Sequence, residues 1–314
     1  MKKFDVLVVG ELNVDLILNR IESFPEMGKE KLAGQMDLTL GSSSAIFASN
    51  LSSLGTKVAF LGKLGDDVFG DLVINSLKSK KVETGFIVRS SAVKTGATIV
   101  LNFSEDRAMV THPGAMEHLT MQDISDQSLQ QARHLHVSSY FLQPGLKGDI
   151  ITIFKRAKSL GLTTSFDPQW DPHEKWDLDL KQVLPVVDIL LPNEQELIHL
   201  TGKQDLATAM AAVKSAPNLV IVKMGSKGSV ALSKGRQTEQ AAFLNPQIVD
   251  AIGAGDSFNA GFVFKFIRKC PVNECLVFGS LMGAVNTTAA GGTTAFSDYK
   301  SVMNLAKKHF NYSE

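Results

Sequence analysis

Residues 250–258 read D-A-I-G-A-G-D-S-F and place three small residues directly before the carboxylate of Asp256. Small residues let the backbone turn sharply and approach a ligand closely. Residues 258–267 are apolar and predict a buried helix, so the turn leads into a helix N-terminus, which favours phosphate oxygens. Asp256 could accept a proton from a hydroxyl that attacks a phosphoryl group. The residues alone leave an alternative, in which Asp256 caps the helix and the glycines form a plain turn.

Acidic and amide side chains also follow two other apolar runs. Residues 10–15 read G-E-L-N-V-D, and residues 192–196 read P-N-E-Q-E. A carboxylate such as Asp15 accepts two or more hydroxyl donors, which suits a polyol. Magnesium keeps several waters and needs few protein ligands, so one carboxylate at Glu196 is sufficient for it. Acids are also common in turns and at helix N-termini, which is the alternative for both residues.

These polar turns need a framework, which the alternation of elements along the chain predicts. Short apolar, β-branched runs alternate with longer amphipathic segments, and this order indicates a mostly parallel α/β sheet with helices on both faces. The runs at 6–9, 58–61, 189–191 and 219–222 are continuously apolar, as expected where both faces of a strand are buried. The predicted strands are 6–9, 58–61, 134–137, 163–166, 189–191 and 219–222, and the predicted helices are 45–54, 69–78, 149–160 and 205–214.

Two segments depart from this alternation and predict a small β-sheet. Residues 12–40 contain strand-like pieces without a helical pattern, and residues 95–103 and 107–111 flank the polar turn Ser104-Glu105-Asp106 as in a β-hairpin. We predict that segments at about 12–40 and 95–113 form a lid that projects from the main sheet. An exposed β-sheet offers an edge for pairing, so a homodimer through the lids is the assembly that the pattern favours.

The composition narrows the classes of function. The chain has 314 residues, of which 44% are hydrophobic and 20% charged, as in an ordinary globular protein. Lys+Arg and Asp+Glu both count 32, which gives no electrostatic reason to expect nucleic acid or a membrane surface as a partner. No run reaches the roughly 20 apolar residues of a membrane span. Without a linker or repeat, residues 1–314 are predicted to form a single domain.

The N-terminus and the cysteines predict a cytoplasmic protein. The first apolar run is broken by Gly10 and Glu11, which favours a β-strand over a signal peptide. Cys270 and Cys275 have no metal-motif partners and are expected to be buried thiols. The sequence also contains no G-x-x-x-x-G-K-[ST], and no G-x-G-x-x-G follows the first predicted strand. These absences argue against a P-loop NTPase and a dinucleotide-binding dehydrogenase.

The motif at 250–258 resembles the D-T-x-G-A-G-D signature of the ribokinase-like (PfkB) carbohydrate kinases, with Ala251 at the usual threonine position. The resemblance runs from residue 8 to about residue 292, with the other landmarks of the family in order. Residues 10–15 resemble its G-x-x-x-x-D opening, and residues 192–196 resemble its N-x-x-E motif. The resemblance implies a three-layer ribokinase-like fold and phosphate transfer from ATP to a hydroxyl group.

The resemblance also implies roles for the residues of the C-terminal motif. Asp256 is expected to be the catalytic base, and Gly253, Ala254 and Gly255 to form the anion hole for the transferring phosphoryl group. Asp250 is similar to a residue that helps hold a monovalent cation behind this loop in several relatives. K⁺ is therefore a further expected ion.

For nucleotide binding, the resemblance points to the start of one predicted helix, at Asn193, and to a later predicted helix. Asn193 and Glu196 are similar to the pair that orders Mg²⁺ near the phosphates, so Glu196 is expected to bind Mg²⁺ largely through water. A helix is predicted at 278–290, and Ser280 lies near the family position that meets the adenine base. ATP and Mg²⁺ are therefore the expected cofactors.

A glycine turn after a predicted strand is the other nucleotide-binding candidate. Residues 222–229, V-K-M-G-S-K-G-S, resemble the T-L-G-x-x-G segment that lies along ATP in the family. Lys223 occupies the threonine position, and Gly225 and Gly228 are its glycines. Lys227 either reaches a phosphate or points into solvent.

The acceptor side begins at Asp15, which is similar to the aspartate that binds sugar hydroxyls in the family, and Asn13 is expected to add a contact. In the hairpin, Arg107 offers a planar fork of donors to a polar or acidic ligand, with an exposed ion pair to Asp106 as the alternative. Further candidates for the pocket, each with a structural role as its alternative, are His112, Tyr140, Gln169 and Trp170.

Residues 40–46, L-G-S-S-S-A-I, resemble the family's G-G-x-x-x-N signature. Gly41 keeps the first glycine, Ser42 replaces the second, and Ile46 replaces a sugar-binding asparagine. Ser42 and Ser43 can donate to the acceptor or cap the following helix. The pocket is therefore expected to contact its sugar differently from ribokinase.

The predicted function is that of an ATP-dependent sugar kinase, which transfers the γ-phosphate of Mg-ATP to a hydroxyl of a sugar or sugar derivative. Two alternatives stay open: a nucleoside kinase of the same fold, and a catalytically silent sugar-binding protein. Retention of Asp256 and Glu196 argues against the silent protein, because a pure binder does not need a base. The expected partner is a small sugar molecule, not nucleic acid or a membrane.

Overall fold

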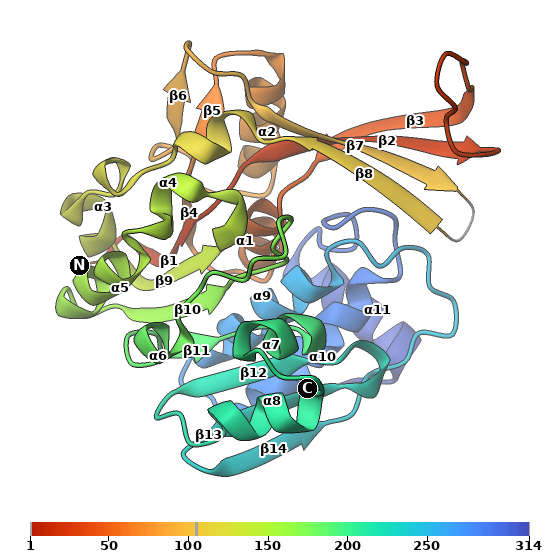
Figure 1. Cartoon of the computed structure of the whole chain (residues 1–314). Helices are drawn as coiled ribbons and strands as arrows, with labels where there is room; N and C mark the ends of the chain where they lie inside the picture. Colours follow the sequence, from red (N-terminus) through yellow and green to blue (C-terminus); the bar gives the residue numbers. More distant parts are fainter. Residues whose placement is uncertain (1, 104–105, 314) are drawn as a thin grey trace.

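The computed structural model describes residues 2–103 and 106–313, although for Asp106 and Arg107 the side chains lie outside that description. An eight-stranded sheet runs through the molecule (Figure 1) in the order β14-β13-β12-β11-β10-β9-β1-β4. Its strands are β1 (Phe4–Val9), β4 (Val58–Leu61), β9 (Ala132–Ser138), β10 (Thr163–Asp167), β11 (Ile189–Leu190), β12 (Leu219–Lys223), β13 (Ser229–Ser233) and β14 (Arg236–Gln240).

The six strands from β12 to β4 pair in parallel, and β13 and β14 complete the sheet as antiparallel strands. All six predicted strands are present within a residue or two of their expected bounds. The antiparallel pair was not predicted, because β14 is an edge strand of polar, mostly exposed residues that carry no apolar signal. The predicted fold class, a mostly parallel sheet flanked by helices, is confirmed.

Helices cover both faces of this sheet, since alternate residues of its strands enter two different cores. Val6 and Val8 of β1 pack with one set of helices, and Leu7 and Val9 pack with the other. The first set is α1 (Ser43–Ser53), α2 (Val68–Ser79), α9 (Ala254–Phe266), α10 (Val272–Asn286) and α11 (Tyr299–Phe310). The second set is α3 (Asp126–Gln130), α4 (Pro144–Lys147), α5 (Ile150–Ser159), α6 (Leu180–Val183), α7 (Glu194–Thr201) and α8 (Leu206–Val213).

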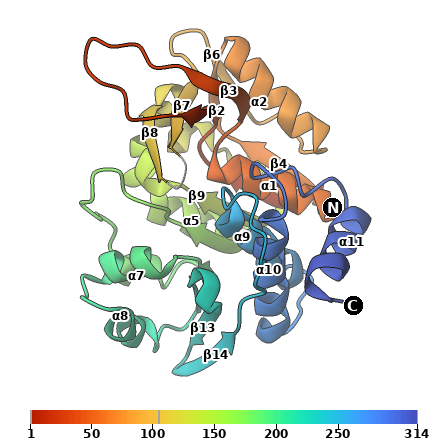
Figure 2. The same ribbon diagram turned by 90° about the vertical axis from the view of Figure 1, so that its right-hand side faces the viewer.

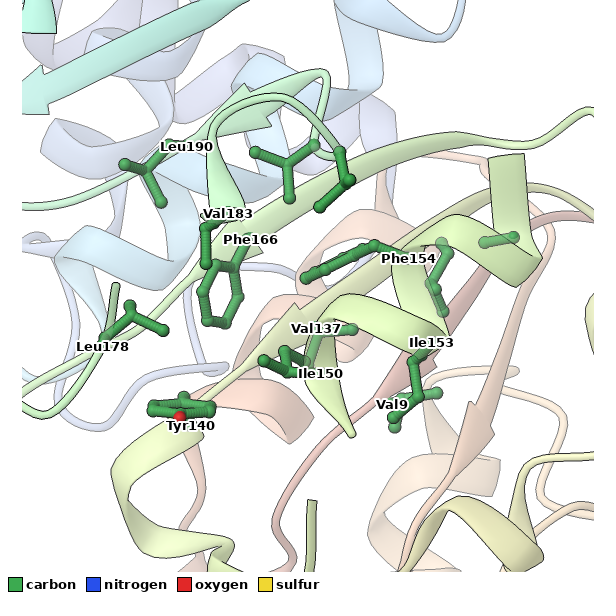
Figure 3. Close-up of a cluster of buried hydrophobic side chains, with 14 of the residues drawn as sticks. Val9, Val137, Tyr140, Ile150, Ile153, Phe154, Phe166, Leu178, Val183 and Leu190 are labelled. Atoms are coloured by element: carbon green, nitrogen blue, oxygen red, sulfur yellow. The ribbon is translucent and has the colours of Figure 1, made fainter. Parts of the chain in front are cut away.

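Figure 2 shows the two sets on opposite sides, with α7 and α8 apart from α10 and α11. Figure 3 shows the core beneath the second set, where Phe154 of α5 and Phe166 of β10 meet with ring centroids 5.3 Å apart. Short 3₁₀-helices connect some elements: η1 (Gly114–His118), η2 (Met121–Asp123), η3 (Tyr140–Leu142) and η4 (Gly225–Lys227). No helix among the described residues is both long and apolar enough to cross a membrane.

A separate four-stranded sheet, the small sheet, projects from this body (Figure 1) in the order β3-β2-β7-β8. Its strands, β2 (Asn13–Ile21), β3 (Ala33–Leu40), β7 (Gly96–Phe103) and β8 (Asp106–His112), fall within the two segments that depart from the alternation in the sequence. β7 and β8 form the expected antiparallel hairpin, whose turn at 104–105 lies outside the described residues. A further pair, β5 (Lys63–Gly65) and β6 (Val88–Ser90), is parallel.

The strand register gives the small sheet two unlike faces. Asp15 is paired with Thr98, and Thr98 with Thr111, so polar side chains share one face. We call the opposite face the outer face; it is apolar and partly exposed, and it consists of Leu16, Leu18, Met36, Leu38, Ile99, Leu101 and Val110.

Two helix bounds differ from the prediction. α9 begins at Ala254, four residues before the predicted start at 258, because its first turn consists of small and polar residues that carry no apolar signal. α10 spans Val272–Asn286 instead of 278–290. It ends at Asn286, whose side-chain amide donates to the carbonyl oxygen of Ile252 at 2.6 Å and so links the helix end to the glycine turn.

Candidate active site

One cavity of about 760 Å³ is lined by the carboxyl ends of several strands, the small sheet and the N-terminus of α9. Most of the predicted site residues meet here, although they are far apart in the sequence. They are Asn13, Asp15, Ser42, Ser43, Asn193, Glu196, Lys223, Gly225, Gly228, Gly253, Ala254, Gly255, Asp256 and Ser280. Gly41 and Asp250 do not line the cavity, and the side chain of Arg107 lies outside the described residues.

Gly253 forms the turn that starts α9. Its φ angle is +75°, and a Cβ atom on it would lie 2.8 Å from Cα of Gly292 and 3.0 Å from Cγ2 of Ile46. Only glycine fits this position, and the chain enters the helix directly after it. Gly253 is the N-cap residue, and Asp256 lies inside the first turn. The alternative in which Asp256 caps the helix is therefore wrong, and the amides of this turn lie in the cavity wall.

The carboxyl group of Asp256 is buried beside the cavity and accepts a hydrogen bond of 3.1 Å from Nε2 of Gln169. Burial raises the pKa of Asp256 to about 8, and the negative charge of Asp167 contributes. The ammonium group of Lys223 opposes this rise in pKa. A carboxyl group with a pKa near the operating pH is suited to exchanging a proton with a substrate hydroxyl.

Lys223, the last residue of β12, supplies a cation beside the glycine turn. Its Nζ atom lies 2.7 Å from Oδ2 of Asp167, and a Cβ atom on Gly255 would lie 3.9 Å from the same Nζ. Burial alone would lower the pKa of Lys223, but Asp167, Glu196 and Asp256 raise it, so the amine stays protonated. The site therefore holds a positive charge where phosphate oxygens can approach.

Asp167 is a residue of this site that the sequence analysis did not include among the candidates for chemistry. It is fully buried at the carboxyl end of β10. Its oxygens accept hydrogen bonds from Lys223, from Nδ2 of Asn259 and from the side chain of Gln169. A charged residue at the end of a buried parallel strand was the available signal, because ligands bind at that edge of α/β sheets.

Glu196 and Asn193 form a capping box at the start of α7. The Glu196 carboxylate accepts from the backbone amide of Asn193 at 2.8 Å and from its Nδ2 at 2.6 Å, and Asn193 Oδ1 accepts from the amide of Glu196 at 2.9 Å. Burial and the charge of Asp167 raise the pKa of Glu196 to about 7. The pair is thus both a helix cap and part of the cavity wall, where further lone pairs of the carboxylate can accept from water.

Lys227 makes an exposed ion pair of 3.0 Å with Glu194. Neither residue lines the cavity. The sequence left open whether Lys227 reaches a phosphate or points into solvent, and the structure places its side chain in solvent.

The end of the cavity next to β12, β13 and α10 combines glycine turns with apolar walls. Gly228 has a φ angle of +101°, and a Cβ atom there would lie 2.0 Å from the carbonyl oxygen of Gln240. The hydroxyl of Ser280 lies 3.1 Å from that of Ser229. Several exposed or half-buried side chains suited to packing on a planar base complete the wall, and they are Phe243, Leu244 and Ile248.

At the opposite end of the cavity, next to the small sheet, Asn13 and Asp15 lie together in β2. Nδ2 of Asn13 donates to Oγ1 of Thr98 at 2.9 Å and to Oδ1 of Asp15 at 3.3 Å. Burial raises the pKa of Asp15 to about 6, the hydrogen bond from Asn13 opposes the rise, and Glu11 adds to it. Gly41 packs behind the pair, since a Cβ atom on it would lie 2.3 Å from Oδ1 of Asp15. Gly41 therefore shapes this end without lining it.

Ser42 caps α1 and closes a turn. Its hydroxyl accepts from the amide of Ala45 at 2.9 Å and donates to the carbonyl oxygen of Glu11 at 2.7 Å. Its φ angle is +72°, a value that favours glycine. Ser42 thus caps the helix, and both Ser42 and Ser43 line the cavity. Glu11, which the sequence analysis did not select, is a buried carboxylate in the cavity wall bonded to Ser44.

Of the four further candidates, Gln169 and Trp170 line the cavity. Tyr140 is buried in the core of Figure 3, and its hydroxyl donates to the carbonyl oxygens of Lys147 and Asp177 at 3.4 Å. Its role is structural. His112 is exposed at the end of β8 and does not line the cavity.

The loop that presents Gln169 and Trp170 is held by Asp171, which accepts the backbone amides of His173, Lys175 and Trp176 at 2.7–2.9 Å. The ring of Trp170 meets that of Trp176 edge-on at 4.9 Å, and Trp176 stacks on His199 of α7 at 4.8 Å. The Trp170 side chain is 43% exposed at the cavity rim.

Asp250 links two loops behind the glycine turn. Its oxygens accept the amides of Ile252 and Gly291, each at 2.9 Å. Each carboxylate oxygen retains a lone pair beyond these bonds.

Comparison with known proteins identifies relatives of the whole chain. A family model described as pfkB family carbohydrate kinase matches residues 3–298. The chain is 27% identical to a 5-dehydro-2-deoxygluconokinase from Lacticaseibacillus casei, over 98% of this chain and 97% of that protein. It is 29% identical to a ribokinase from Haemophilus influenzae, over 95% of this chain and 97% of that protein.

Solved structures agree with this grouping. Arabidopsis thaliana ribokinase complexed with ribose and ATP has a TM-score of 0.85 at 26% identity, covering 97% of this chain and 99% of that chain. A putative ribokinase II from E. coli has a TM-score of 0.84 at 22% identity, covering 98% and 100%, which shows the fold alone. The family model covers most of the chain, so the resemblance and the ribokinase-like fold are confirmed. This chain belongs to the pfkB family of carbohydrate kinases.

Proposed function

We propose that this protein is an ATP-dependent sugar kinase, which transfers the γ-phosphate of Mg-ATP to a hydroxyl of a sugar or sugar derivative with Asp256 as general base. The observation that carries the proposal is the placing of a buried carboxyl group, a lysine ammonium and the first turn of α9 in one cavity. Ribokinases among the relatives, one of them solved with ribose and ATP, support the substrate class.

The reaction needs one proton transfer and one phosphoryl transfer. The Asp256 carboxylate takes the proton of the acceptor hydroxyl as its oxygen bonds to the γ-phosphorus, and the bond from that phosphorus to the bridging oxygen of ATP breaks, releasing ADP. Lys223 and the amides of Gly253, Ala254 and Gly255 stabilise the negative charge on the transferring phosphoryl group. Asn13 and Asp15 orient the acceptor by hydrogen bonding to its hydroxyl groups, which keep their protons.

Mg-ATP lies along the nucleotide end of the cavity. Asn193, Gly225, Gly228 and Ser280 line its binding site, and Glu196 holds Mg²⁺ largely through water. Support comes from a putative ribokinase II from E. coli, which was solved in complex with ATP and Mg²⁺. The free lone pairs of the Glu196 carboxylate suit such water-mediated binding.

A monovalent cation such as K⁺ fits at Asp250, because both of its oxygens keep acceptor capacity beside the two amides. Backbone carbonyls of the loop would supply the remaining ligands. The cation would offset the Asp250 charge behind the glycine turn. The proposal is tested by comparing thermal unfolding and activity in K⁺ with those in tetramethylammonium, and equal values in both would contradict it.

The small sheet acts as a lid over the acceptor, and its outer face pairs two copies of the chain. Support for the pairing comes from Met36 and Val110, whose apolar side chains are each 65% exposed on this face. Arg107, in the same sheet, is proposed to contact the acceptor.

A nucleoside kinase of the same fold is the second candidate. Trp170 and the apolar residues Val100, Met109 and Leu142 line the cavity and could pack on a base. The first test is ADP release from Mg-ATP across a panel of sugars, sugar acids and nucleosides, with Asp256→Asn in parallel. Turnover on a sugar that the variant loses supports the proposal, and turnover on nucleosides alone supports the second candidate. No turnover on any acceptor, with ATP still bound, would favour a silent binding protein.

A further inference from the structure

Asp167 bonds directly to Lys223 and is linked to Asp256 through Gln169, and it does not line the cavity. Its Oδ2 atom accepts from Nζ of Lys223 at 2.7 Å and from Nε2 of Gln169 at 2.9 Å. Asn259 of α9 donates to the same oxygen. Its Oδ1 accepts from the backbone amide of Gln169 at 3.3 Å. A carboxylate so enclosed has no room for a substrate, so its function must lie in what it holds.

Gln169 joins Asp167 to Asp256. Its Nε2 donates to Oδ2 of Asp167 at 2.9 Å and to Oδ1 of Asp256 at 3.1 Å, and so bridges two carboxyl groups. The backbone φ angle of Gln169 is +62°, a value that is uncommon for residues other than glycine. Asp171 fixes the loop that follows, by accepting the amides of His173 and Trp176, and the Gln169 side chain contacts Asp256.

We propose that Asp167 is a positioning residue, which holds the Lys223 ammonium directly and the Asp256 carboxyl group through Gln169, so that the cation for the phosphoryl group and the base for the acceptor keep a fixed relative placement. The inference rests on the proposed role of Asp256. Holding the Lys223 ammonium and the Asp256 carboxyl group in place before the substrate binds lowers the activation barrier, since misplacement by about 1 Å can reduce a rate about 100-fold.

The groups around Asp256 also set the pH at which it can act as a base. Glu11 after β1 and Asp167 on β10 raise the pKa of Asp256, whereas Lys223 on β12 and the Gln169 hydrogen bond lower it. Glu196 on α7 raises the pKa of Lys223. His136 of β9, which faces Lys223, is neutral because burial lowers its pKa well below the usual value. Asp167 and Gln169 therefore act on the base with opposite signs.

Two substitutions separate these effects. Asp167→Asn removes the negative charge, so the acid limb of the pH profile of kcat/KM should move to lower pH. Gln169→Leu removes a donor to the ionised carboxylate, so the limb should move to higher pH. In both variants kcat should fall by about 100-fold, with a smaller change in the KM of the acceptor.

Asp188→Asn is the matched control. Asp188 forms an ion pair of 2.5 Å with Lys158 and accepts from Thr164, at the opposite end of the same sheet. This variant should lower thermal stability and leave the pH profile unchanged.

Opposite shifts of the acid limb in the two variants support the inference, and an unmoved limb in either variant overturns it. Should Asp167→Asn fail to fold, Gln169→Leu alone tests the inference, because it keeps Asp167 in place and its acid limb is expected to move to higher pH. Asp256→Asn, assayed in parallel, distinguishes a failure of the proposed kinase function from a failure of the role proposed for Asp167. Retained turnover in that variant would overturn the proposed function, whereas its loss together with unmoved limbs would overturn only the role of Asp167.

Discussion

The two ends of the cavity are built in different ways. Around Asp256, residues from β10, β12 and α9 contact one another through Asp167, which is fully buried and has four donors. At the other end, next to the small sheet, the side chains of Asn13 and Asp15 bond only to each other and to Thr98 among the contacts described. Both ends contain an amide oxygen that is buried without a partner, Oδ1 of Asn13 and Oδ1 of Asn259. The ends differ in their carboxylates: that of Asp167 has its donors in place before any ligand arrives, whereas that of Asp15 accepts from Asn13 and keeps lone pairs that a ligand can use.

This difference suggests that the two ends of the cavity have different functions. A network of charges on the large sheet, centred on the buried Asp167 carboxylate, suits a reaction common to many substrates, because its geometry must not vary. A sparse set of acceptors on a projecting sheet suits the selection of one substrate. Substitutions at the two ends should therefore have different kinetic signatures, in kcat for the first and in KM for the second.

The largest effect on kcat is expected for Asp256→Asn, which removes the proposed base and keeps the shape of the side chain. We expect kcat to fall by about 10²–10⁴-fold, the usual contribution of a positioned base. ATP affinity, measured by calorimetry, should be nearly unchanged. Near-normal turnover would remove Asp256 from the reaction.

Lys223→Met should disturb both rate and stability. The substitution leaves the buried Asp167 charge without its cation, which costs about 3–5 kcal/mol in the free energy of unfolding. Because Lys223 lowers the pKa of Asp256, the acid limb of kcat/KM should move to higher pH. Urea unfolding and a pH series measure the two effects. Lys227→Met, at an exposed lysine in the same segment, is the control and should change neither.

Asp15→Asn should act on the acceptor alone. Loss of a charge-assisted hydrogen bond of about 1.5–3 kcal/mol should raise the KM of the acceptor about 10- to 150-fold and leave kcat within a few-fold. The pKa of Asp15 is raised to about 6, so in the unmodified protein this KM should rise as the pH falls through 6. That dependence should vanish in the variant. A fall in kcat with constant KM would contradict the division between the two ends.

The smallest effect on chemistry is expected at the outer face of the small sheet. Ile99→Glu and Leu38→Glu place charges in the proposed contact between two copies, where each native side chain is 42% exposed. Sedimentation should show a shift from dimer to monomer. Met27→Glu, at a fully exposed position between β2 and β3, should not shift it. A monomeric unmodified protein would contradict the pairing.

Local patterns were sufficient to predict the frame of this molecule. Most of the parallel strands are short apolar runs, and small residues around Gly253 indicate a tight turn. The edge strand β14 carries no such pattern, because its residues are polar and mostly exposed. Sequence patterns therefore report burial well and edge pairing poorly.

The contacts within the site were harder to predict. Asp167 and Lys223 are 56 residues apart and meet only because β10 and β12 end at the same edge of the sheet. Glu11 is likewise identified by its burial against Ser44, a contact that no local motif contains. Motif resemblance identified residues that line the cavity, and the structure adds those that contact them from behind.

The loop after β10 also gives the protein a built-in optical probe. The chain has two tryptophans, Trp170 and Trp176, and their rings lie 4.9 Å apart at and behind the cavity rim. Indole emission from this protein therefore reports on one place, within a few residues of the amide that contacts Asp256. Filling the cavity changes the polarity around Trp170, so ligand binding can be followed by intrinsic fluorescence without a label.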